Sequence, residues 1–296
     1  MTAGIIFIAI GEKWHQETIV AATTAKQFMP DIPITVFADR FFSAPAIDEV
    51  RVVAPGSNPL LTKTLWMWQS PYERTLFLDT DITLCEKIDD IFMLLDRFDL
   101  AVPHAPYRLA SMGLSIPIPE FLNAAVPACF PGMNTGMLLF KRTPKVQAFF
   151  DIWCDYHQQT ESLMPKAPSQ PAFRAALYHS DLRFAIIPEE YHCRFIYPFK
   201  ICGKVKVLHG RHPDMESVIN RINQVPLPRV GEGYFVDLSR KHDLKQVPNQ
   251  EDAIKSGLFS GLRKWLRSFG TNSDQHAPIP SLPPACIQNG GIITLS

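Results

Sequence analysis

The chain has 296 residues, 46% of them hydrophobic, and its 29 basic residues balance 29 acidic ones. A net charge of zero provides no overall field to attract a polyanion, so a nucleic-acid partner is not expected. The length and the 20 phenylalanines are enough for a substantial core, in one large domain or two ordinary ones.

The cysteines and the N-terminus indicate a cellular location. The six cysteines form no CxxC pair and have no regular spacing, so we interpret them as reduced thiols. The apolar run at 4–10 is too short to span a membrane and has no basic residue before it, which favours a first strand over a signal peptide. We therefore expect a cytoplasmic protein, in peripheral contact with a membrane at most.

In the first third of the chain, continuous apolar runs alternate with helical spacing. The expected strands are 4–10, 34–39, 50–55 and 75–81, and the expected helices are 14–29 and 60–69. This alternation predicts an α/β fold with a mostly parallel sheet that is covered by helices on both faces. Ligands of such sheets collect at the carboxyl ends of strands, where Asp39 and Asp79 lie.

The middle of the chain continues the pattern after a long irregular connection. Residues 103–131 contain six prolines and little periodicity, which is typical of a lid or a binding loop. Thr143 before Pro144 has the pattern of a helix start, and Ser169 is the expected cap of the next helix. The expected elements are helices at 88–98, 143–159 and 168–180, and strands at 99–105, 135–141, 184–191 and 203–211.

The composition changes after about residue 245. Residues 251–269 have one apolar face among basic residues and Trp265, which predicts a helix that lies in a membrane interface or docks on the domain. Residues 271–296 are rich in Pro, Gly, Ser and Asn, which predicts a disordered tail. The expected organisation is one domain over 1–245, an amphipathic helix over 246–270 and a tail over 271–296.

Two carboxylates, Asp79 and Asp81, follow the apolar run TLFL. In an extended segment they point the same way, about 6.5 Å apart along the chain. There they repel each other unless a cation lies between them, and Mn²⁺ or Mg²⁺ with open positions for a diphosphate suits such a pair. Taken alone, the motif is equally compatible with a solvated strand end.

The stretch FLDTDITL also matches the nucleophile strand of haloacid-dehalogenase-like phosphatases. In those enzymes the first aspartate attacks phosphorus and the second acts as general acid or base. Their fold has this strand near its start, whereas three expected strands precede it here. It also needs a late acidic pair, for which Glu189 and Glu190 are the nearest candidates.

A different context comes from the order of several motifs. The segment from Lys63 into FLDTD, then MNTGMLLF (133–140), SQPAFRAAL, IIPEEYHCRF and VLHG (207–210), resembles the glycogenin-like glycosyltransferases of GT-A fold. The opening of the chain is similar to their first nucleotide-binding unit, so the resemblance covers about residues 4–215. It implies a GT-A fold, with a Rossmann-like mixed, mostly parallel sheet, and nucleotide-sugar chemistry.

The resemblance also implies a metal site and a donor site. Asp79, Asp81 and His209 would bind Mn²⁺ or Mg²⁺, which bridges the donor diphosphate. Asp81 and Gln170 would take part in catalysis, with Gln170 beside the anomeric carbon. The donor, expected to be a UDP-sugar, would contact Ile8, Ala9, Ile10, Gly11, Asp39, Lys63, Thr80, Asn134, Thr135, Gly136, Ser169 and Arg211.

The chain departs from the pattern of this family at two places. It has Ser169-Gln170 where the family has Asp-Gln, and that acidic residue normally orients the transferred sugar, so the sugar and full activity stay open. After His209 the chain reads HGRHP rather than H-x-x-G-x-x-K-P-W, so Arg211 or His212 is expected to take over a phosphate contact.

The resulting prediction is a metal-dependent, retaining glycosyltransferase that acts on an unknown glycan, lipid or protein acceptor. Retention is compatible with the lack of an evident general base near the motif, because the leaving phosphate can itself take the acceptor proton. Two alternatives remain open. One is the phosphatase that uses Asp79 and Asp81, and the other is a catalytically silent nucleotide-sugar-binding protein, which the serine at position 169 motivates.

Overall fold

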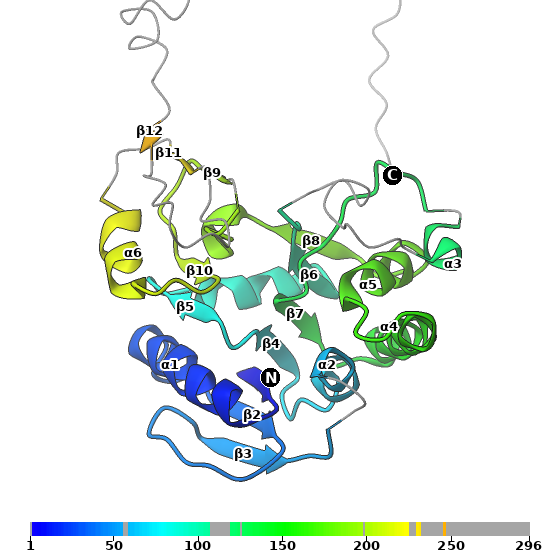
Figure 1. The fold of residues 1–296 in the computed structure, drawn as a ribbon, viewed down its shortest axis with the longest axis horizontal. Coiled ribbons are helices and arrows are strands. Elements are labelled where there is room, and N and C mark those ends of the chain that lie inside the picture. The colour runs from blue at the N-terminus through cyan, green and yellow to red at the C-terminus, as the bar shows by residue number, and fades with distance from the viewer. Residues whose placement is uncertain are drawn as a thin grey trace, which may run out of the picture. The chain divides into compact units, whose positions relative to one another are not determined.

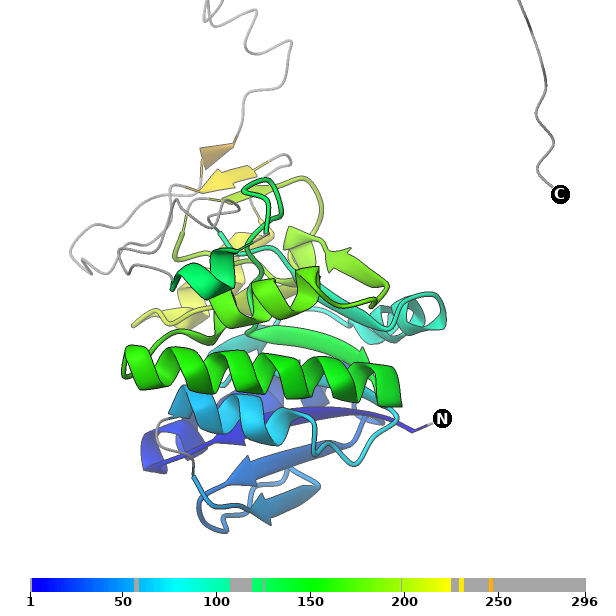
Figure 2. The same cartoon turned by 90° about the vertical axis from the view of Figure 1, so that its right-hand side faces the viewer.

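The computed structural model describes residues 2–55, 59–106, 119–124, 126–197, 199–224, 229–231 and 245–246, and Figures 1 and 2 show it from two perpendicular directions. The helix expected at 251–269, the tail expected at 271–296 and residues 107–118 and 125 of the proline-rich connection lie outside these residues. Within the described part, no helix combines the length and the apolar character that a membrane crossing requires.

The centre of the fold is a seven-stranded sheet with the order β3-β2-β1-β4-β7-β6-β8. All neighbouring strands are parallel except β7, which runs antiparallel to both β4 and β6. The expected α/β class with a mixed, mostly parallel sheet is therefore confirmed. The strands are β1 (Ala3–Ala9), β2 (Ile34–Ala38), β3 (Glu49–Val52), β4 (Arg74–Leu78), β6 (Leu100–Pro103), β7 (Met137–Lys141) and β8 (Phe184–Ile187).

Helices cover both faces of this sheet, as Figure 1 shows. One face packs on α1 (Glu12–Phe28) and on the 3₁₀ helix η1 (Asp89–Asp96), and the other packs on α2 (Pro59–Met67), α4 (Pro144–Leu163) and α5 (Ser169–Tyr178). Side chains of β1 alternate between the two resulting cores, Ile5 and Phe7 in one and Ile6 in the other. The strand is an unbroken apolar run because both of its faces are buried.

Smaller elements complete the described chain. The strand β5 (Ile82–Leu84) pairs antiparallel with β10 (Val207–His209), and in this register Ile82 lies opposite His209. This pairing brings a residue from late in the chain next to the end of β4. The remaining elements are α3 (Glu120–Asn123), the 3₁₀ helix η2 (Glu189–Tyr191), α6 (Met215–Ile222), and a second sheet of β9 (Phe199–Ile201), β11 (Arg229–Gly231) and β12 (Lys245–Gln246).

Of three local predictions, two are confirmed and one is wrong. The helix expected at 88–98 is present at Asp89–Asp96 as a 3₁₀ helix, in which bonds such as Ile91 N–H to Ile88 O close three-residue turns and apolar residues pack on the sheet. Ser169 is the first residue of α5 rather than its cap, and no side chain caps this helix. Thr143 does cap α4: its hydroxyl oxygen accepts from Val146 N–H at 3.3 Å, and Pro144 follows.

Candidate functional site

A cavity of about 290 Å³ opens at the carboxyl ends of β1 and β4, beside the start of β7 and the end of β10. This is the edge at which parallel α/β sheets bind ligands. The structure brings together there residues that are up to about two hundred positions apart in the chain. The lining consists of Ile8, Ile10, Trp14, Leu60, Lys63, Asp79, Thr80, Asp81, Asn134, Gln170, Arg194, His209 and Arg211.

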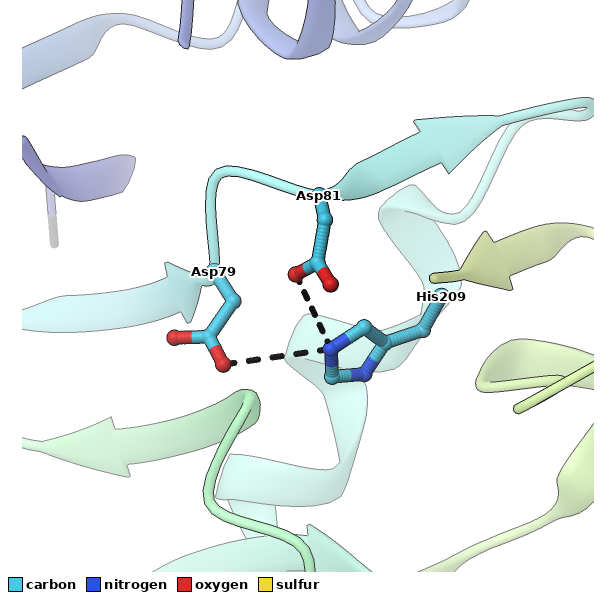
Figure 3. Close-up of side chains that lie close together, drawn as sticks. All are labelled: Asp79, Asp81 and His209. Carbon is cyan, nitrogen blue, oxygen red and sulfur yellow. Dashed lines mark ion pairs between the residues drawn. The ribbon is translucent and has the colours of Figure 1, made fainter. Parts of the chain in front are cut away.

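Two carboxylates and one imidazole face each other in this cavity (Figure 3). Asp79 follows β4, Asp81 directly precedes β5, and His209 ends β10. His209 Nε2 lies 3.1 Å from an oxygen of Asp81 and 3.8 Å from an oxygen of Asp79, and the candidate ligand atoms of all three lie within 4.8 Å of one another.

This arrangement fits a divalent cation. An ion about 2.1 Å from each of its ligand atoms holds those atoms at most about 4.2 Å apart, so a small adjustment of the three side chains would suffice. Carboxylate oxygen and imidazole nitrogen together suit Mn²⁺ or Mg²⁺ better than a soft metal. Asp79, Asp81 and His209 are therefore the residues that could hold a metal.

A second histidine, His192, supports the first. Its Nε2 lies 2.6 Å from Nδ1 of His209, and both rings are buried. Burial lowers the pKa of both imidazoles well below 6.5, so both rings are neutral. A neutral His209 that donates Nδ1–H to His192 keeps the lone pair of Nε2 for a metal.

We expect that replacing His192 by leucine weakens Mn²⁺ binding about 10–100-fold, because His209 loses the partner that fixes its ring and tautomer. Calorimetric titration of the purified variant with Mn²⁺ measures the effect. His192→Gln retains a carbonyl oxygen that can accept the Nδ1–H and should recover part of the affinity. His179→Leu is the matched control, because His179 is exposed and outside the cavity. Unchanged affinity in His192→Leu would contradict the role of the pair.

Three basic side chains surround the two aspartates and offset their mutual repulsion. Lys63 Nζ donates to Asp79 Oδ1 at 2.8 Å, and a guanidinium nitrogen of Arg211 lies 3.1 Å from Asp81 Oδ2. A nitrogen of Arg194 lies 3.9 Å from the same oxygen. All three cations line the cavity, so they are also in position to contact a diphosphate. Arg194 was not predicted, since nothing in the sequence connects it with Asp81.

Arg211 is held in place by the first turns of α1. Its Nε and Nη2 donate to the two carboxylate oxygens of Glu17 at 2.5 and 2.8 Å, and its guanidinium lies over the ring of Trp14. Hydrogen bonding to Glu17 raises the pKa of Arg211 above its ordinary value. The hydroxyl of Thr80 also donates to Glu17. Of the two residues considered for a phosphate contact, Arg211 lines the cavity and His212 does not.

Gly136 lies directly against the metal candidates. A Cβ at this position would lie 2.1 Å from Cε1 of His209 and 2.7 Å from a carboxylate oxygen of Asp79. The backbone around it is held by two hydrogen bonds, from Gly136 N–H to the side chain of Asn134 and from Asp79 N–H to Gly136 O. Glycine is needed here because of this close approach, so the motif NTG positions Asp79 and His209.

Some of the residues expected to contact a donor do not line the cavity. Asp39 accepts hydrogen bonds from Gly11 N–H and His15 Nε2, both at 2.8 Å, and although burial raises its pKa, these bonds bring it below the ordinary value. The hydrogen bond from Gly11 N–H to Asp39 ties the turn after β1 to the end of β2. The expected donor contacts outside the lining are Ala9, Gly11, Asp39, Thr135, Gly136 and Ser169.

Gln170 and Ser169 point in different directions at the start of α5. Gln170 lines the cavity. The side chain of Ser169 is buried, with its hydroxyl 3.4 Å from that of Thr135, and its carbonyl accepts from the indole N–H of Trp153. Position 169 therefore belongs to the packing between α5, α4 and the start of β7, while position 170 faces the cavity.

The acidic pair that a phosphatase would need is not in this cavity. Glu190 accepts hydrogen bonds from the backbone N–H groups of Cys202 and Gly203 at 3.0 and 2.9 Å, and neither Glu189 nor Glu190 lines the cavity of Asp79. The strand that carries the aspartates, β4, also lies in the middle of the sheet, after three other strands. This geometry favours the glycosyltransferase interpretation.

The sequence matches no protein-family model and no curated protein. Similar solved structures are glycosyltransferases. The glycosyltransferase GlyE of Streptococcus pneumoniae TIGR4 has a TM-score of 0.53 at 12% identity over 76% of this chain, and the match spans only 61% of the GlyE chain.

A galactosyltransferase, LgtC, solved in complex with donor and acceptor sugar analogues, has a TM-score of 0.52 at 12% identity over 76% of this chain and 98% of its own. An LgtC mutant with an active-site glutamine changed to glutamate has a TM-score of 0.53 at 14% identity, with the same coverage. At these identities the likeness is one of fold, and it confirms the expected GT-A fold.

Proposed function

We propose that this chain is a metal-dependent glycosyltransferase that moves a sugar from a nucleoside diphosphate donor, a UDP-sugar, to a glycan, lipid or protein acceptor with retention of configuration. The observation that carries the proposal is the cluster of Asp79, Asp81 and His209 at the ligand-binding edge of a GT-A sheet, among Lys63 and Arg211. It is supported by the neighbour LgtC, whose structure was solved with analogues of both substrates.

The cavity offers a different kind of contact for each part of a donor. Ile8, Ile10 and Trp14 provide an apolar wall, which suits the base and ribose. Lys63, Arg194 and Arg211 lie around the carboxylates, where they can donate to diphosphate oxygens. Asn134 and Gln170 supply amide groups at the remaining wall, which suits the hydroxyl groups of the transferred sugar.

The reaction requires stabilisation of the leaving diphosphate as the glycosidic bond breaks. Asp79, Asp81 and His209 would hold Mn²⁺ or Mg²⁺, which supplies Lewis-acid charge when bound. Lys63 and Arg211 add hydrogen-bond donors. The guanidinium of Arg211 is at a fixed position, since Glu17 and Trp14 hold it before substrate binds. This arrangement lowers the cost of reorganisation during the reaction.

Retention is compatible with the set of carboxylates that line the cavity. Of the described lining residues, only Asp79 and Asp81 are carboxylates, and both are needed for the metal. A leaving phosphate oxygen is then the base that takes the acceptor proton. Gln170 would stand beside the anomeric carbon, and the LgtC mutant supports this role because its changed active-site residue is also a glutamine.

We assign the transferase domain to residues 1–245 in the cytoplasm. The amphipathic segment 251–269 is kept as a candidate contact with a membrane surface, where a lipid-linked or membrane-bound acceptor would be found. Residues 271–296 would form a tail beyond it.

The proposal can be tested by measuring Tm in the presence of a panel of nucleoside diphosphates and nucleotide sugars. Each compound is measured with Mn²⁺, with Mg²⁺ and with a chelator. We expect a UDP-sugar with Mn²⁺ to raise Tm, since a ligand at 100 times its Kd stabilises the folded state by about 2.7 kcal/mol. UDP release without acceptor, measured in parallel, separates a transferase from a silent binding protein. A chain that no nucleotide stabilises, or that releases inorganic phosphate without nucleotide, would contradict the proposal.

A further inference from the structure

A second cavity, of about 450 Å³, lies beside the first at the same edge of the sheet. Its wall comes from the ends of β6 and β8, from η2 and the turn after it, and from β9. The residues that matter are His104, Ile187, Glu189, His192, Arg194 and Lys200. Its volume is in the range of sites for small ligands.

The sheet order explains why the two cavities are neighbours. The strands β6 and β8 are parallel, with Pro103 opposite Ile187 at their carboxyl ends, and β7 lies between β6 and β4 (Figure 1). The first cavity is at the end of β4 and the start of β7, and the second is at the ends of β6 and β8. Two ligands bound there would lie side by side along one edge.

Two residues join the cavities. Arg194 lines both of them, and His192, in the wall of the second, contacts His209 in the wall of the first. A group-transfer enzyme must hold two substrates in contact, because most of the advantage of a bound pair comes from their fixed proximity. A cavity that shares a wall with the proposed donor site is therefore placed for the second substrate.

The charges of the wall indicate what kind of ligand fits. The Nε–H of Arg194 is buried and has no hydrogen-bond partner within the described part of the chain, and its guanidinium packs over the ring of Tyr197. Arg194 lines the cavity, and one of its terminal nitrogens lies 3.9 Å from Asp81, beyond hydrogen-bond distance. The guanidinium therefore has donors that a ligand oxygen at the cavity wall can use, which gains binding energy. Lys200 adds a second cation, which is exposed. The described lining residues thus include two cations and one carboxylate, that of Glu189.

We infer that this second cavity binds the acceptor of the transfer and that the acceptor carries an anionic group, a phosphate or a carboxylate on the sugar, held between Arg194 and Lys200. Guanidinium groups bind both anions through paired hydrogen bonds. The inference rests on the proposed function, since it assigns the second substrate of that reaction.

The inference can be tested with a panel of acceptors. The donor in each assay is the nucleotide sugar that gives the largest rise in Tm. Glucose, galactose and N-acetylglucosamine are each compared with their 6-phosphates and, for the first two, with their uronic acids, and products are detected by mass spectrometry. We expect the anionic forms to be glycosylated at least about 10-fold faster in kcat/KM than their neutral parents. The phosphate and uronate arms distinguish the two anions.

Lys200→Glu should lower kcat/KM for the anionic acceptors by about 10–100-fold, the loss of one charge-assisted hydrogen bond. The rise in Tm produced by the donor with Mn²⁺ reports whether the first cavity of this variant is intact. Lys141→Glu is the matched control: Lys141 ends β7 at the opposite edge of the sheet, so its kcat/KM should not change.

Each other outcome overturns a specific statement. Three outcomes would each overturn the inference and leave the proposed function in place. Neutral sugars could serve as well as anionic ones, or kcat/KM could stay unchanged in Lys200→Glu. The third outcome is no product from any acceptor while the donor binds and is hydrolysed. A chain that binds no nucleotide sugar would overturn the proposed function, and the inference with it.

Discussion

Asp81→Asn is expected to remove the stabilisation that Mn²⁺ and a nucleotide give the wild-type chain, and to lower kcat on the order of 10²–10³-fold, the range for losing a group that stabilises developing charge. The amide keeps the size of the side chain but cannot hold a cation as a carboxylate does. It also leaves Arg211 and Arg194 without the anion that they now face. Calorimetric titration with Mn²⁺ and a UDP-release assay measure the two effects.

Asp89→Asn provides the matched control for this variant. Asp89 lies on η1 and forms an ion pair with Lys87 at the surface, so its loss should change neither metal affinity nor turnover. If Asp81→Asn bound Mn²⁺ and a nucleotide as tightly as the wild type, the metal assignment would be wrong, although a nucleotide site could still exist.

Gly136→Ala is expected to damage both the fold and the site. The added Cβ would lie 2.1 Å from the His209 ring and 2.7 Å from Asp79, so one of these side chains or the start of β7 must move. Overpacking of this kind costs about 1–3 kcal/mol of unfolding free energy. Because the displaced groups are candidate metal ligands, Mn²⁺ affinity should fall together with stability. Denaturant unfolding and metal titration of the same sample test both.

Gly203→Ala distinguishes a specific collision from a general effect of the substitution. The nearest atom to a Cβ there is Cγ of Glu190, at 3.1 Å, so a shift of a few tenths of an ångström relieves the contact while the carboxylate of Glu190 keeps its bonds to the backbone. We expect a loss of less than about 1 kcal/mol and unchanged Mn²⁺ affinity. Equal behaviour of the two variants would show that the contact of Gly136 with the metal candidates has no special weight.

Much of the local structure could be predicted from the sequence, because it depends on short-range chemistry. Continuous apolar runs form β1, β2 and β4, since a strand buried on both faces has no polar side to alternate with. Thr143 and Pro144 start α4 through a cap that involves only the first turn. The exceptions, η1 and the start of α5, differ in hydrogen bonding that packing decides.

The candidate site could be predicted only in part. Asp79, Asp81, His209, Lys63 and Gln170 were expected from motif order, and they do line one cavity. Glu17, His192 and Arg194 were missed: each acts through a partner far away in the chain, as Glu17 does with Arg211. A signal for Glu17 existed, three residues after Trp14 on the same face of α1, but it could not name Arg211 as the partner.

By itself the sequence determined the alternation of strands and helices and the two carboxylates between β4 and β5, since these depend on neighbouring residues. The tertiary structure alone decided which cations offset the negative charge of those carboxylates and which histidine supports His209. It also decided that a second cavity adjoins the first. The physical reason is that these features arise where separate strands meet: the antiparallel insertion of β7 and the pairing of β5 with β10 set which side chains face each other, and no local preference specifies either pairing.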